Sequence, residues 1–125
     1  MSTVKLNRNV LSVFAPVLIL TGIAGFLIPS QYSLTSGAAP YNLFHILFGA
    51  IGLFLVSTNI PQGPILFNIG FGLIDLYQAV ASVFYLPPQR LFMWTFVDDL
   101  LHVVLGVTLV LIGLSGILKR EEEIQ

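Results

Sequence analysis

Apolar residues fall into four long stretches, separated by short polar and proline-containing segments, at residues 9–28, 42–58, 65–85 and 97–118. A helix needs about 20 residues to cross the hydrocarbon core of a bilayer, so each stretch has the length of a membrane span. Helix-breaking prolines stand in the gaps, at Pro29, Pro61, Pro64 and the pair Pro87-Pro88. The pattern predicts an all-α membrane four-helix bundle that forms a single domain over residues 1–125.

The composition supports a membrane protein and excludes several other classes. Hydrophobic residues make up 56% of the chain and charged residues 9%, whereas soluble domains contain about 25% charged residues. A net charge of −1 provides no basic surface for nucleic acid. The absence of cysteine excludes disulfides and thiolate chemistry. The expected partners are the lipid bilayer and other membrane-protein subunits or further copies of the chain.

Positive charges predict the orientation of the four spans. Lys5 and Arg8 precede the first stretch and Lys119 and Arg120 follow the last, whereas the opposite side holds only Arg90. The positive-inside rule therefore places both termini in the cytoplasm. A signal peptide at the N-terminus is disfavoured, because the first apolar stretch is too long and no Ala-x-Ala-like site follows it. Aromatic residues are then expected at the outer interface, at Tyr32, Tyr41, Tyr85 and Trp94.

An internal repeat relates the second and fourth stretches. Residues 42–49 read NLFHILFG and residues 99–106 read DLLHVVLG, which brings the two histidines of the chain, His45 and His102, into register. A repeat of two spans returns the chain to its starting side, so we expect two tandem helical hairpins arranged as parallel repeats. The two histidines should then lie at one depth, near the outer ends of their helices.

The same segments resemble a known family. The pattern Asn42-x-x-His45-x-x-x-Gly49-x-x-Gly52-Leu53, followed by Asp99-x-x-His102-x-x-x-Gly106, is similar to a bacterial family of small four-helix membrane proteins that is catalogued as a domain of unknown function. The resemblance implies a four-span fold in a bacterial inner or thylakoid-type membrane. It implies no reaction, substrate or cofactor.

The two histidines are the first candidate site. Asn42 and Asp99 each precede a histidine by three positions and therefore share its helix face. Such a partner fixes the imidazole tautomer and leaves the other ring nitrogen free to act as a ligand. A structural, hydrogen-bonded role is the first interpretation. The alternatives are haem or chlorophyll binding through His45 and His102, and a small metal or proton role. A zinc site is disfavoured, because two histidines and one carboxylate barely reach its ligand count.

Asp75 is the second candidate. It lies in the middle of the third stretch, where an ionised carboxylate costs several kcal/mol of free energy and no cation is available to pair with it. We therefore expect it to be protonated or hydrogen-bonded to Gln78 and a facing helix. The polar residues of this stretch follow one helical stripe, which is either a buried polar seam or a track for a proton-linked solute carrier: Asn68, Asp75, Gln78, Ser82 and Tyr85.

Glycines at near-helical spacing predict close helix packing, at Gly22, Gly25, Gly49, Gly52, Gly106, Gly113 and Gly116. No nucleotide-binding loop and no catalytic serine motif is present in the sequence. The sequence therefore favours a small non-enzymatic membrane protein, an accessory or assembly subunit that packs against a partner through its glycine faces. The tetrapyrrole-binding subunit and the Asp75-dependent carrier are the alternatives.

Overall fold

The computed structural model describes residues 2–124, and side-chain surroundings for residues 2–119. The protein is all-helical: helices account for 83% of it, and the described residues contain no β-strand. The four long helices are α1 (Thr3–Leu27), α2 (Ala39–Ser57), α3 (Gln62–Phe84) and α5 (Phe96–Ile124), joined by the short elements η1 (Ser30–Tyr32) and α4 (Gln89–Phe92). The all-α prediction is confirmed. The side chains of Arg120 and of the three glutamates that follow lie outside the described part of the chain.

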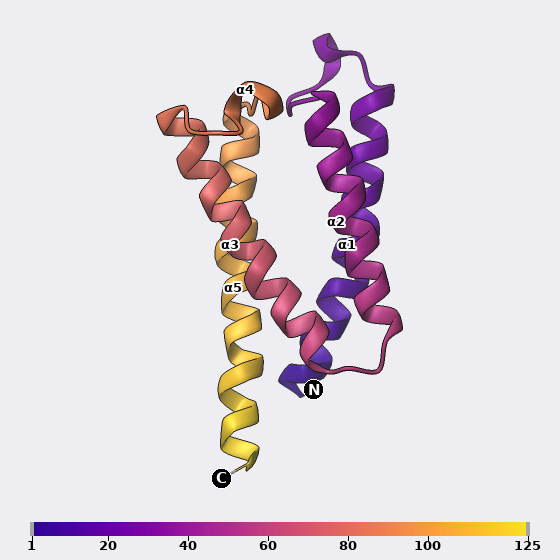
Figure 1. Ribbon diagram of the computed structural model, residues 1–125, viewed down its shortest axis with the longest axis vertical. Coiled ribbons are helices and arrows are strands. Elements are labelled where there is room, and N and C mark those ends of the chain that lie inside the picture. The colour runs from indigo at the N-terminus through magenta and orange to yellow at the C-terminus, as the bar shows by residue number, and fades with distance from the viewer. Residues whose placement is uncertain (1, 125) are drawn as a thin grey trace.

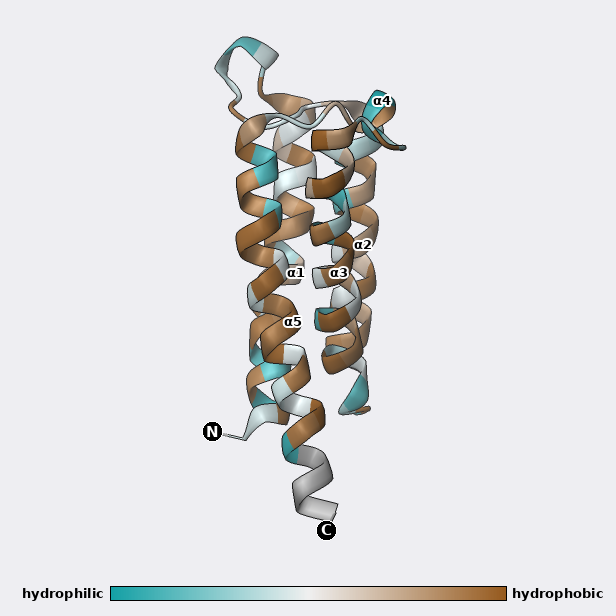
Figure 2. Ribbon diagram, turned by 90° about the vertical axis from the view of Figure 1, so that its left-hand side faces the viewer, coloured by the Kyte–Doolittle hydropathy of each residue, from teal (hydrophilic) through white to brown (hydrophobic). Residues whose placement is uncertain are grey.

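Each long helix is apolar enough and long enough to cross a membrane. Hydrophobic residues dominate the visible outer faces of these helices (Figure 2). Large apolar side chains remain well exposed there, among them Leu20, Val83 and Leu111. In water such a surface would drive association, whereas in a bilayer it meets lipid. The predicted set of four apolar, membrane-compatible helices is therefore confirmed.

Local chemistry sets helix ends that hydropathy alone does not reveal. α1 begins at Thr3, ahead of the apolar stretch, because the Oγ of Ser2 accepts a hydrogen bond from the backbone N–H of Lys5 at 3.1 Å. α2 begins at Ala39 with a proline in its first turn, where the missing N–H has no helical acceptor. α3 ends at Phe84, because Tyr85 adopts the left-handed conformation with φ of 58°.

The four long helices form two closely packed pairs, α1 with α2 and α3 with α5 (Figure 1). Glycines bring the backbones of each pair together. A Cβ atom on Gly49 would lie 2.7 Å from the carbonyl oxygen of Ala15 in the first pair. In the second pair, a Cβ atom on Gly106 would lie 2.9 Å from the carbonyl oxygen of Gly72. Such close approach is how membrane helices gain packing energy where lipid supplies no hydrophobic drive.

Both chain termini lie at one end of the bundle, the terminal end, and residues 28–38 and 85–95 lie at the other, the loop end (Figure 1). Asparagines tie the helices together at the terminal end. Asn7 of α1 donates to the carbonyl of Ile112 in α5 at 3.0 Å, and it accepts from the Nδ2 of Asn68 in α3 at 2.9 Å. Both asparagines are fully buried. They therefore join three helices where no water can replace the bonds.

Asp98 performs the corresponding task at the loop end. It forms a capping box with Thr95 at the start of α5: the N–H of Thr95 donates to Asp98 at 2.8 Å, and the N–H of Asp98 donates back to the Thr95 hydroxyl at 3.3 Å. The same Asp98 oxygen accepts the N–H of Ser36 at 2.8 Å. One carboxylate thus starts α5 and holds the segment before α2 against it.

Candidate functional site

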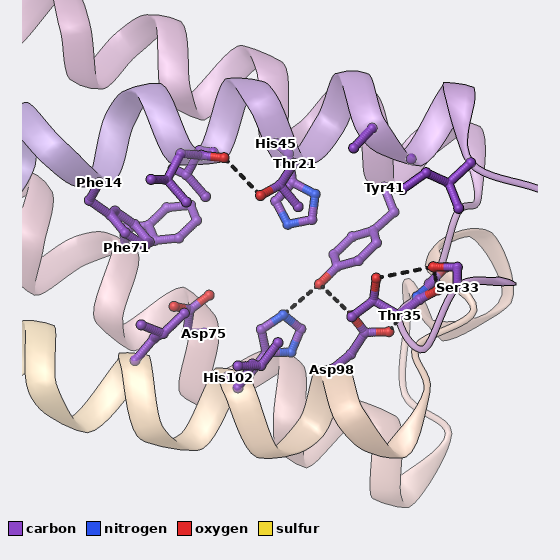
Figure 3. Close-up of a pocket in the computed structure, with 18 residues that line it drawn as sticks. Phe14, Thr21, Ser33, Thr35, Tyr41, His45, Phe71, Asp75, Asp98 and His102 are labelled. Carbon is purple, nitrogen blue, oxygen red and sulfur yellow. Dashed lines mark hydrogen bonds between the residues drawn. The ribbon is translucent and has the colours of Figure 1, made fainter.

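A cavity of about 350 Å³ lies between the two helix pairs at the loop end. Its walls come from all four long helices and from the segment that follows α1. α1 contributes one continuous face, from Phe14 through Leu18 and Thr21 to Ala24 and Gly25, as the helical period requires. Most of the wall is apolar. Five side chains with titratable groups also reach it (Figure 3): Tyr41, His45, Asp75, Asp98 and His102.

Both histidines face this cavity, and neither faces lipid. His45 is 9% exposed and His102 is 5% exposed. The phenol of Tyr41 lies against both imidazoles, with ring centroids 4.2 Å from His45 and 6.0 Å from His102 (Figure 3). The two imidazoles therefore belong to one site.

Tyr41 links His102 to Asp98. Its hydroxyl lies 2.7 Å from the Nε2 of His102 and donates to Asp98 at 3.4 Å. A phenol has one proton to donate, so the Nε2 of His102 donates to the phenol oxygen when that proton goes to Asp98, and accepts the phenol proton in the other tautomer. His45 differs, because it makes ring contacts with Tyr41 and Phe44 and no hydrogen bond within the described part of the chain.

The residues expected to support the histidines do not do so. The Nδ2 of Asn42 donates to the carbonyl of Gly37 at 2.9 Å, which closes the loop before α2. One oxygen of Asp99 is buried without a hydrogen-bond partner among the described residues. Neither residue bonds to a histidine. Tyr41, which precedes Asn42 by one position, bonds to His102 instead, and Asp98, which precedes Asp99, bonds to Tyr41.

A spacing in the sequence could have indicated these two residues. Tyr41 and Asp98 each lie four positions before a histidine, and residues four apart share a helix face as fully as residues three apart. Tyr41 was expected at the membrane interface with Trp94, but both are buried, at 2% and 6% exposure. Tyr32 and Tyr85, the other two residues of that prediction, are exposed at the loop end.

The polar stripe of α3 divides among three environments. Asn68 joins the asparagine pair at the terminal end. Asp75 is 2% exposed and faces the cavity (Figure 3). One of its carboxyl oxygens accepts a hydrogen bond from Gln78 at 3.4 Å, and the other has no partner within residues 2–119. Gln78 also accepts the indole N–H of Trp94 at 3.0 Å. Ser82 is half-buried, and Tyr85 is 78% exposed beyond the end of the helix.

The predicted glycines pack within the chain. Gly22 and Gly25 face α2, Gly49 and Gly52 face α1, and the glycines of α5 face α3, where Gly116 also meets Asn7. A Cβ atom on any of Gly22, Gly49, Gly52, Gly106 or Gly116 would come within 3.0 Å of a neighbouring atom, and one on Gly25 or Gly113 would be closer still. These glycine faces are therefore occupied by intramolecular contacts.

Comparisons of the chain with protein-family models, with curated proteins and with solved structures find no match. Within the described residues, no group of three or more histidine, aspartate or glutamate side chains is placed to hold a metal ion. The chemistry of the cavity therefore carries the functional argument.

Proposed function

We propose that the protein is a small non-enzymatic integral membrane protein that binds a small molecule in the cavity between its two helix pairs. One observation carries this proposal: His45 and Asp75 are buried, face the same cavity, and have hydrogen-bonding capacity that no described residue uses. An unpaired polar group in a low-dielectric interior costs free energy. A ligand that bonds to both side chains would remove that cost.

The hydroxyl groups of the cavity support a binding role over catalysis. Thr21 donates to the carbonyl of Val17 at 2.7 Å, and Ser36 donates to the carbonyl of Phe92. Neither of these hydroxyls is bonded to a histidine, so neither has a base that would activate it as a nucleophile. The Tyr41 hydroxyl is the one bonded to an imidazole among the described residues of the cavity, and Asp98 also contacts it.

Tetrapyrrole binding receives less support from the geometry. A haem held between His45 and His102 would need a flat space between the two imidazoles, and the ring of Tyr41 packs against both of them. The Nε2 of His102 is also engaged by the Tyr41 hydroxyl at 2.7 Å. A proton-linked carrier that uses Asp75 remains compatible with the binding proposal, since Asp75 faces the cavity. An accessory-subunit role would have to use the lipid-facing side chains, because the glycines pack internally.

The proposal includes a tandem arrangement of two hairpins. Its support comes from equivalent contacts at a shift of 57 residues. Gly49 packs on Ala15 and Ile19 of the first pair, and the equivalent Gly106 packs on Gly72 and Leu76 of the second pair, which are the positions that the shift predicts. Phe14 and Phe71 are also related by this shift, and their rings meet at 5.6 Å between the pairs.

We place the terminal end of the bundle in the cytoplasm of a bacterial cell, as the distribution of cations favours. Lys5, Arg8 and Lys119 belong to this end, and Arg90 lies in α4 at the loop end. Arg8 also has a structural task, because its guanidinium donates to the carbonyls of Val56 and Thr58 at the end of α2. The cavity then lies toward the outer face of the membrane.

Filling the cavity tests the binding proposal. Ala24 lines the cavity, whereas Ala50 is exposed on the outer side of α2. Wild-type protein purified in mild detergent should carry a small molecule that native mass spectrometry detects. Ala24→Leu should lose this molecule, and Ala50→Leu should retain it. Equal occupancy in both variants, or an empty wild-type protein, would contradict the proposal. A visible Soret band would favour the tetrapyrrole alternative instead.

A further inference from the structure

An apolar groove of about 420 Å³ lies beside the cavity, between α1 and α5. Its walls include Val13, Phe14 and Val17 of α1, and Leu105, Thr108 and Leu109 of α5. α1 contacts α5 far less than it contacts α2, so the groove occupies a weakly packed seam of the bundle. Val13 is 67% exposed and Val17 is 48% exposed, so the groove opens toward the surrounding lipid.

The groove and the cavity form one continuous site. Phe14, Val17 and Leu105 belong to the walls of both. From Val17 the groove follows α1 toward the terminal end as far as Asn9, a length of roughly 12 Å at the rise of an α-helix. The site thus has a polar part at the loop end and an apolar part that extends into the hydrocarbon depth. This is the shape of an amphiphile with a compact head and a hydrocarbon chain.

The charges on the cavity wall restrict the head of that amphiphile. Asp75 and Asp98 line the cavity, and neither lysine nor arginine occurs among its lining residues. A phosphate or carboxylate head would meet the carboxylate of Asp98 without a compensating cation. Asp98 accepts from Ser36, Thr95 and Tyr41 and is already satisfied. The cavity-lining residues with an unsatisfied buried atom are His45, Asp75 and His102. Of these, His45 and Asp75 suit an uncharged head with hydrogen-bond acceptors.

The shape of the cavity wall favours a flat head. Five ring side chains line it, Phe14, Tyr41, His45, Phe71 and His102 (Figure 3). Aromatic walls pack well against another ring. We propose that the continuous site binds an uncharged, ring-headed membrane lipid with the chemistry of an isoprenoid quinone. The ring lies in the cavity with its carbonyls facing the N–H of His45 and the protonated carboxyl of Asp75, and the chain lies in the groove. This inference rests on the proposed function and names its ligand class.

The single tryptophan of the chain provides the assay. Trp94 is buried, and its ring centroid is 6.2 Å from that of His102, so a quinone in the cavity would quench its fluorescence. A decyl-substituted benzoquinone, titrated into the full-length protein in detergent, should quench Trp94 saturably. Val17→Phe narrows the junction of groove and cavity and should weaken this binding about tenfold, equivalent to 1.4 kcal/mol. Val104→Phe, on a lipid-facing position of α5 that lines neither space, is the matched control and should bind as wild type does.

Comparison probes separate failure of this inference from failure of the proposed function. If the same benzoquinone without its chain binds as tightly, and Val17→Phe has no effect on either probe, the cavity binds a small solute and the lipid assignment is wrong. If decyltrimethylammonium displaces the quinone at lower concentration than the quinone itself requires, the head is cationic and the assignment is also wrong. If none of the three probes gives a saturable signal that Ala24→Leu abolishes, the binding function fails together with the lipid inference.

Discussion

Replacing Gly72 by alanine would place a methyl group between α3 and α5 where the two helices pack closely. The new Cβ atom would lie 2.8 Å from a methyl carbon of Val110, 2.9 Å from the carbonyl oxygen of Gly106 and 3.0 Å from the backbone nitrogen of Val110. Two of these three atoms belong to the backbone and cannot rotate away. Because ordinary van der Waals contact begins at 3.4 Å, the two helices must move apart by about half an ångström at this point.

The expected loss of stability combines two effects of opposite sign. Overpacking of this kind costs about 1–3 kcal/mol. Alanine in place of glycine within a helix stabilises that helix by about 0.5–1 kcal/mol. Gly70, two residues earlier in α3, is the matched control, because a Cβ atom there meets nothing within 4 Å. Gly70→Ala should keep the helical gain without the clash, so the two variants should differ by about 1–3 kcal/mol.

Unfolding of both variants in mixed micelles, followed by far-ultraviolet circular dichroism, measures this difference. Gly72→Ala should unfold at lower denaturant than wild type, and Gly70→Ala at equal or higher denaturant. Both substitutions change helix propensity alike, so the difference reports the contact between α3 and α5. Equal stability of the two variants would refute the close packing of this helix pair.

Three further substitutions and fusions test the site and the topology. Asp75→Asn should leave the free energy of unfolding nearly unchanged, whereas Asp75→Leu should lower it by about 0.6 kcal/mol through loss of one intramembrane hydrogen bond. If a well-folded Asp75→Asn variant instead loses ligand binding, Asp75 must titrate. Tyr41→Phe should destabilise the protein by about 1 kcal/mol or more, because a buried nitrogen of His102 loses its partner. An imidazole nuclear magnetic resonance spectrum that this substitution leaves unchanged would contradict the Tyr41–His102 bond. Reporter fusions after Gln125 and at Ser36 should report the cytoplasmic and the outer side respectively, and an external C-terminus would overturn the proposed orientation.

The helices could be predicted because hydropathy encodes them locally. A run of about 20 apolar residues is enough to specify a membrane helix, whatever packs against it. The contact between Asp75 and Gln78 was likewise accessible, since it joins residues three apart on one helix. Tyr85 shows the limit of this reasoning. It continues the polar stripe by spacing, but a left-handed backbone ends the helix at that residue and turns it outward.

The partners of the histidines depend on contacts between helices, which no periodicity records. Tyr41 and Asp98 were available on the same faces as His45 and His102, but the bond that matters crosses from α2 to α5. Asn42 and Asp99 offered the more familiar side chains for an imidazole, yet the fold uses Asn42 to close a loop. The cavity is also a property of the assembled bundle, since its wall draws on four helices.

The ties between the two helix pairs differ at the two ends of the bundle, and this difference bears on how the cavity can widen. At the terminal end, the fully buried side chains of Asn7 and Asn68 join α1, α3 and α5 through bonds that lipid cannot replace. At the loop end, Asp98 alone accepts from both Ser36 and Tyr41 of the opposite pair. Tyr41 also bonds to His102, and Ser36 donates to the carbonyl of Phe92. Widening of the cavity toward the loop end therefore requires these bonds and those to Asp98 to break together, while the asparagines hold the terminal end.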